Sequence, residues 1–117
     1  MIVIDYKDAR PIYEQVVERF SELILKGVLE ADSQMPSVRS LAMELSINPN
    51  TIQKAYMELE RRGYIYSVKG RGSFVQDAKA LLNERKKNCL ARIADETRAA
   101  IGYGITKEEI KNMVDSI

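Results

Sequence analysis

The sequence predicts a mostly α-helical chain with one small β-hairpin. Two short helical stretches, residues 35–45 and 48–63, follow each other closely, and apolar side chains recur every three to four residues in both. Residues 64–75 form two strand-like runs around a glycine-rich turn. Residues 77–117 return to the helical period. We therefore expect two parts, residues 1–76 and residues 77–117.

The first helix is expected from Pro11 to about Lys26, with Gly27 closing it. Apolar side chains recur along one side: Ile12, Val16, Phe20, Leu23 and Ile24. This spacing is typical of a stripe that faces a hydrophobic core. We assign the stripe to packing and give it no role in ligand binding.

Two short amphipathic helices come next. Ser37 and Asn48 can each cap one of them by accepting a backbone N–H, and Pro49 loses no hydrogen bond at the first helical position. The core-facing stripes are Val38, Leu41, Ala42 and Leu45, then Ile52, Ala55, Tyr56 and Leu59. Because only Ser46 and Ile47 separate the two helices, the pair has a helix-turn-helix arrangement.

A β-hairpin is expected directly after the second of these helices. Residues 61–63 end that helix with two arginines and a glycine. The cations suit the negative C-terminal end of the helix dipole, and glycine suits the position directly after a helix. Residues 64–68 are rich in aromatic and β-branched side chains, and residues 73–75 form the return strand. The turn, residues 69–72, carries two cations and two glycines. A hairpin with a cationic tip beside a helix-turn-helix makes a winged helix-turn-helix domain.

These elements resemble the winged-helix domain of the GntR family of bacterial transcription regulators. The runs that carry the resemblance are Pro11-Ile12-Tyr13-Glu14-Gln15, Pro36-Ser37-Val38-Arg39, Asn50-Thr51-Ile52, Leu59-Glu60-Arg61-Arg62-Gly63 and Gly70-Arg71-Gly72-Ser73-Phe74-Val75. Asp32 stands where the family often has glycine, and aspartate tolerates a left-handed turn. Pro49 also departs, because many members have a basic or polar residue there. The Asn48-Pro49-Asn50-Thr51 run and the short tail resemble the YtrA-type branch.

Composition is that of a globular protein, with 45% hydrophobic and 30% charged residues and a formal net charge of +1. The charges are zoned. Acidic residues gather on the first helix and its flanks: Asp5, Asp8, Glu14, Glu18, Glu22, Glu30 and Asp32. Cations gather on the helix-turn-helix and the hairpin: Arg39, Lys54, Arg61, Arg62, Lys69 and Arg71. Such zoning suits a face presented to phosphates, and a mixed solvated surface is the alternative.

Several function classes are disfavoured by the composition. No apolar run approaches a membrane span and no signal-peptide pattern opens the chain, so we expect a cytoplasmic protein with no membrane partner. One cysteine allows no disulfide framework or cysteine-rich zinc site, and the absence of histidine removes the commonest general base. We expect no enzyme activity, no cofactor and no metal site.

Residues 77–117 are expected to form a short two-helix C-terminal dimerisation tail. Asp77 can cap its first helix, residues 102–104 break it, and Thr106 and Glu109 have capping-box spacing. The apolar positions assigned to a homodimer interface are Leu82, Cys89, Leu90, Ile93, Thr97, Ile101, Ile110, Met113 and Val114. The two apolar stripes have more surface than a tail of this size can bury by itself. A second copy is the expected partner, and folding back onto the winged domain is the alternative.

The function that we expect is sequence-specific binding of double-stranded DNA by a dimeric transcription regulator that acts as a repressor on a palindromic operator. Predicted contacts are Ser37, Arg39, Asn48, Asn50, Thr51, Gln53, Lys54, Lys69, Gly70 and Arg71. Amides at Asn50 and Gln53 suit base edges. Arg39 suits guanine or phosphate, and the resemblance places a DNA-contacting arginine there.

The remaining contacts are assigned to the DNA backbone. Ser37, Thr51 and Lys54 suit phosphates, and the hairpin tip, residues 69–71, suits the backbone or the minor groove. Ser37 and Asn48 can also act as helix caps, and the two roles do not exclude each other. For the glycines of the hairpin tip, the alternative is that they serve only as turn residues.

The resemblance also implies a target, because short-tailed members of the family are often tied to transporter operons. Two other functions stay open. One is a winged-helix module that binds proteins and not DNA, which a salt series separates from DNA binding because phosphate contacts weaken steeply as salt rises. The other is a small-molecule sensor that uses a cleft between dimer tails. No effector is assigned from the sequence.

Overall fold

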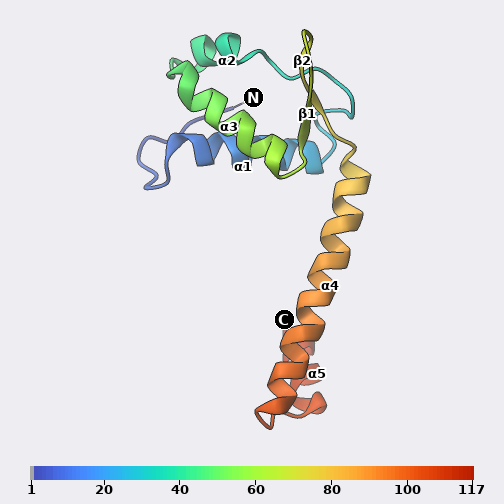
Figure 1. The fold of residues 1–117 in the computed structure, drawn as a ribbon. Helices are drawn as coiled ribbons and strands as arrows, with labels where there is room; N and C mark the ends of the chain where they lie inside the picture. Colours follow the sequence, from blue (N-terminus) through green and yellow to red (C-terminus); the bar gives the residue numbers. More distant parts are fainter. Residues whose placement is uncertain (1) are drawn as a thin grey trace. The chain divides into compact units, whose positions relative to one another are not determined.

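The computed structural model describes residues 2–117 and is shown in Figure 1. Its elements in chain order are α1 (Ile12–Leu25), α2 (Val38–Leu45), α3 (Pro49–Arg61), β1 (Ile65–Val68), β2 (Gly72–Val75), α4 (Ala78–Gly102) and α5 (Lys107–Asp115). The chain divides into two compact units, the first ending at Leu82 and the second comprising residues 83–117. The predicted fold class is confirmed: mostly helical, with a hairpin and a helical C-terminal segment.

The helix starts follow the predicted capping residues. Ser37 accepts a hydrogen bond from the backbone N–H of Ser40 over 3.0 Å, and Asn48 accepts one from Asn50 over 2.8 Å. Pro49 is the first residue of α3. Asp32 has a φ of +64°, so this aspartate adopts the left-handed backbone that the turn requires.

The core of the first unit lies where α1, α2, α3 and the hairpin meet, and α3 crosses α1 in Figure 1. The predicted stripes on α1 and α3 are buried: Val16, Phe20, Leu23 and Ile24 with Ile52, Ala55, Tyr56 and Leu59. The predicted α1 residue Ile12 is only partly buried against them. Phe20 and Tyr56 meet edge to face, with ring centroids 6.0 Å apart. Ile2 adds a buried side chain that the sequence did not predict.

Residues 32–35 pair with β2, which the sequence did not predict. β1 and β2 are antiparallel, with Ile65 opposite Val75. On the other edge of β2, the backbone N–H of Met35 donates to the carbonyl of Ser73 over 2.8 Å, and Val75 donates to Ser33 over 2.9 Å. The extended segment therefore satisfies backbone groups that a lone hairpin would leave on an open edge.

The second unit contains the rest of α4, a turn and α5. The predicted capping box is present, because Glu109 N–H donates to Thr106 Oγ1 over 3.1 Å and Thr106 N–H donates to Glu109 Oε2 over 3.2 Å. Not one residue of 83–117 is buried. In residues 2–117, no helix combines the length and the apolarity that a bilayer crossing requires.

Candidate nucleic-acid interface

The outer face of α3 is polar and exposed. Asn50, Gln53 and Lys54 lie on it, opposite the buried stripe of the same helix, and Thr51 is half-buried beside them. Within residues 2–117, the side-chain amides of Asn50 and Gln53 take part in no hydrogen bond. Their donors and acceptors are therefore available to an outside partner such as a base edge. Met57, one turn after Gln53, is also exposed, and the sequence predicts no role for it.

A partly buried hydrogen bond links the start of α2 to α3. The hydroxyl of Tyr56 donates to the carbonyl of Pro36 over 2.6 Å. Burial raises the pKa of Tyr56, so the hydroxyl keeps the proton that this bond requires. Arg39, on the first turn of α2, is exposed and forms no ion pair within the described part of the chain.

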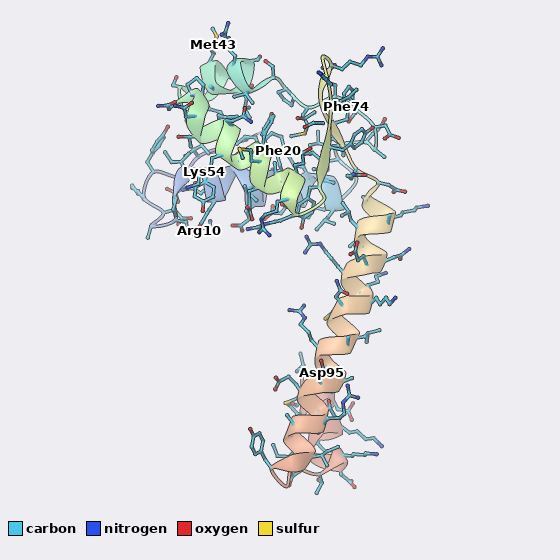
Figure 2. The ribbon with its side chains drawn as sticks, viewed as in Figure 1. Arg10, Phe20, Met43, Lys54, Phe74 and Asp95 are labelled. Carbon is cyan, nitrogen blue, oxygen red and sulfur yellow. The ribbon has the colours of Figure 1, made fainter. Side chains whose placement is uncertain are left out.

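Lys54 packs against a ring on α1. Its ammonium Nζ lies 4.0 Å from the centroid of the Tyr13 ring, which is within the range of a cation–π contact. Figure 2 shows Lys54 where α3 passes α1. The sequence predicts a phosphate contact for Lys54 but contains no signal for this partner, which stands far from it along the chain.

The end of α3 has less free positive charge than the sequence indicates. Glu58 pairs with Arg61 over 2.5 Å and with Arg62 over 2.8 Å. These hydrogen bonds lower the pKa of Glu58 to about 2, so the carboxylate stays ionised and offsets part of the local charge. Both pairs have the i,i+3 or i,i+4 spacing of helix-surface ion pairs, a signal that was readable in the sequence.

The hairpin tip is exposed, and a hydrogen bond from the segment before α2 supports it. Lys69, Gly70 and Arg71 form the turn, and Gly70 has a φ of +77°. The side-chain Nε2 of Gln34 donates to the carbonyl of Arg71 over 2.7 Å. A Cβ on Gly72 would stand 3.3 Å from that Nε2 at a φ of +109°, so glycine suits both the conformation and the close approach. The sequence contained no signal for this hydrogen bond between Gln34 and Arg71.

A second hydrogen bond and a pair of stacked rings support the base of the hairpin. The hydroxyl of Tyr66 donates to Asp32 Oδ1 over 2.7 Å. The Tyr66 ring stacks on Phe74, which Figure 2 labels on the hairpin, with centroids 5.8 Å apart. The left-handed turn at Asp32 therefore also supports the hairpin through its side chain.

All the predicted DNA contacts belong to the first unit. In Figure 1, α2 and the tip of the hairpin lie at the same end of that unit. The predicted contacts are exposed except for Thr51, which is half-buried: Ser37, Arg39, Asn48, Asn50, Gln53, Lys54, Lys69, Gly70 and Arg71. Their individual roles in DNA binding remain predictions.

An apolar groove runs between α4 and α5 within the second unit. It has a volume of about 510 Å³. Six predicted interface residues line it: Cys89, Ile93, Thr97, Ile110, Met113 and Val114. Leu90 and Ile101 are exposed but do not line it, and Leu82 belongs to the first unit. In residues 2–117, no cluster of histidine, cysteine or carboxylate side chains could hold a metal ion.

Comparisons with known proteins agree with this geometry. The sequence model of a family described as bacterial regulatory proteins, gntR family, matches residues 12–75. The HTH-type transcriptional repressor YtrA of Bacillus subtilis (strain 168) is 47% identical over 87 residues, 74% of this chain and 67% of that protein.

Two solved structures extend the likeness. YtrA from Sulfolobus acidocaldarius, a GntR-family transcription factor, matches with a TM-score of 0.65 and 30% identity, over 98% of this chain and 94% of that one. AraR(DBD) in complex with operator ORE1 matches with a TM-score of 0.55 and 32% identity, over 64% of this chain and 92% of that one.

Proposed function

We propose that this chain, which belongs to the GntR family of bacterial regulatory proteins, acts as a homodimeric repressor that reads a palindromic operator. Family membership makes it a DNA-binding transcription regulator and not an enzyme. The dimer, the operator symmetry and the target gene are the parts that we propose. The observation that carries the proposal is the exposed polar face of α3, whose amide side chains have no partner of their own within residues 2–117.

The proposed interface combines base reading with phosphate contacts. Asn50 and Gln53 lie three residues apart on one exposed face of α3, so both can enter a major groove and meet adjacent base pairs. Arg39 and the hairpin tip supply cations for the flanking phosphates. The likeness to AraR(DBD), which was solved with its operator, supports this use of the domain.

The proposed dimer rests on the second unit. None of its residues is buried, and the apolar residues Leu90, Ile93 and Met113 each expose more than half of their surface. Apolar surface of this extent on a helical pair without a core indicates a surface that another molecule covers. We assign a second copy of the chain, because a two-fold dimer places two copies of the first unit on two half-sites.

The proposed role is repression in the cytoplasm, where a DNA-binding regulator meets its operator. Support comes from the relative in Bacillus subtilis, which is a transcriptional repressor. The resemblance to short-tailed members of the family further suggests a transporter operon as the target. A dimer on an operator can act as a repressor simply by covering DNA that a polymerase must use.

Selection of bound duplexes from a random DNA pool tests the proposal. The full-length chain should enrich a two-fold symmetric site whose half-sites are centred about 10 base pairs, or a multiple of this, apart. Enrichment of an asymmetric single half-site would remove the palindromic operator and leave DNA binding. Absence of any enrichment at about 0.1 M salt, a concentration at which phosphate contacts still contribute, would contradict the proposal as a whole.

A further inference from the structure

The contact between Lys54 and Tyr13 joins the proposed DNA-reading helix to α1. The ammonium lies 4.0 Å from the ring centroid. Lys54 is exposed, whereas the ring of Tyr13 is half-buried and packs against the hydrophobic core. The ring is therefore a fixed support and the lysine is the mobile member of the pair. The negative face of the ring attracts the cation and leaves the outer N–H groups of the ammonium free.

The hydroxyl of Tyr13 contributes little to this arrangement. It donates to Glu14 Oε1 over 3.4 Å, which is long for an O–H···O hydrogen bond. The position of the ring depends on its packing against the core, and the attraction of the cation depends on the ring. Phenylalanine at this position should therefore hold Lys54 as tyrosine does.

Lys54 is held close to the first turn of α3. It lines a shallow depression of about 440 Å³ together with Asn50 and Thr51 of that turn, with Ile12 and Tyr13 of α1, and with Pro11, which precedes α1. A lysine side chain loses much conformational freedom when it is fixed on a phosphate. A ring that already restricts the side chain reduces that loss, which strengthens binding without adding a contact to DNA.

We propose that Tyr13 is a positioning residue for DNA binding, because its ring holds the Lys54 ammonium beside the first turn of α3, where it meets a DNA phosphate. This inference rests on the proposed function. Tyr13 itself is not proposed to touch DNA. The competing interpretation is that the contact only fastens α1 to α3, in which case it contributes to folding and not to binding.

Phosphate binding does not depend on sequence, so a fluorescein-labelled duplex of arbitrary sequence is a sufficient probe. Fluorescence anisotropy over roughly 50–200 mM salt gives affinity and salt slope for the full-length protein and its variants. Lys54→Ala should weaken binding roughly five- to tenfold near 0.1 M salt and lower the slope by about one. Tyr13→Met, which keeps apolar bulk and removes the ring, should weaken binding about two- to fivefold.

Two further variants separate positioning from packing. Tyr13→Phe should bind as the wild type does. The double variant Tyr13→Met/Lys54→Ala should bind no more weakly than Lys54→Ala alone, because the ring acts only through the lysine. Tyr6→Leu, at a tyrosine that is 69% exposed, is the matched control for loss of a ring. Urea unfolding without DNA establishes that each variant is folded, and Tyr13→Leu replaces Tyr13→Met if the latter is not.

The outcomes distinguish this inference from the proposed function. A wild-type chain that does not bind the duplex overturns both. A second outcome is that the wild type binds the duplex, but folded Tyr13→Met or Lys54→Ala keeps the affinity and salt slope of the wild type. This outcome overturns only the positioning role. Losses that multiply in the double variant also overturn it, because they show that Tyr13 acts independently of Lys54.

Discussion

The side-chain hydroxyl of Tyr56 donates a hydrogen bond to the main-chain carbonyl of Pro36 over 2.6 Å. Pro36 precedes the cap of α2, whereas Tyr56 lies on the core face of α3 and its ring meets Phe20 of α1 edge to face. One side chain therefore links α1, α2 and α3 of the first unit. The link adds to the core packing that holds α2 against α3.

Tyr56→Phe should destabilise the first unit by about 1–2 kcal/mol, because it leaves the Pro36 carbonyl without its partner. Urea denaturation followed by circular dichroism measures the change. Tyr103→Phe, at a side chain that is 86% exposed, is the control and should have almost no effect. Equal unfolding midpoints for the two variants would show that the hydroxyl does not contribute.

Glu58 predicts a specific dependence of stability on acid. Its folded-state pKa, about 2, lies below the ordinary value of 4.5 because Arg61 and Arg62 donate to it. The stability that it contributes is therefore present above pH 4.5 and is lost as the pH falls towards 2. Urea unfolding of the wild type and Glu58→Gln should differ at pH 6 and converge near pH 2. A constant difference across this range would contradict the assignment.

Gln53→Ala should relax the preference at one base position of each half-site, with a loss of about 1–3 kcal/mol in discrimination. An amide presents a donor and an acceptor together, which distinguishes base pairs. Lys54→Ala is the contrast and should weaken all sequences alike, because an ammonium acts on phosphate as a point charge. Competition against single-base variants of the selected site measures both, and unchanged ratios for Gln53→Ala would exclude it as a base reader.

The double substitution Lys69→Ala/Arg71→Ala tests the hairpin tip. DNA affinity should fall and the salt slope should become shallower by up to about two, one for each lost phosphate contact. Thermal stability should stay unchanged, because exposed cations contribute little to it. Lys107→Ala/Lys111→Ala in α5 is the matched control. Superimposable salt series for the wild type and the hairpin variant would leave the tip without a role in DNA binding.

Ile93→Glu and Met113→Glu test the dimer, because both side chains line the groove of the second unit. A charge in a covered apolar interface carries a large desolvation cost, so each variant should shift the chain towards monomer. Light scattering at micromolar concentration measures the mass. Val3→Glu, at a valine that is 85% exposed in the first unit, is the matched control. A full-length wild-type monomer would contradict the proposed dimer directly.

Local signals predicted most of the fold. Ser37, Asn48 and Thr106 act on neighbouring backbone groups, so their capping roles follow from short sequence spacing. The stripe at Ile52, Ala55, Tyr56 and Leu59 follows from the helical period. The pairing of Glu58 with Arg61 and Arg62 has equally short spacing and could have been predicted.

Contacts between distant parts of the chain were not predicted. Gln34 and Arg71 stand 37 residues apart. Residues 32–35 have neither the alternation nor the β-branched and aromatic side chains that are typical of a strand. Tyr13 and Lys54 meet only because α1 and α3 cross. Neither contact leaves a periodic or compositional trace, because each depends on where the packed core places two unrelated surfaces.

Sedimentation velocity of a fluorescein-labelled duplex that carries the selected site tests whether a dimer of this chain binds its operator through phosphate contacts. We predict one complex with a pair of chains on each duplex, which dissociates steeply as salt rises from about 0.1 M. We also predict that Ile93→Glu abolishes this complex at concentrations that saturate the wild type. A complex with a single chain on each duplex, or a complex that does not respond to salt, would contradict dimeric binding through phosphates.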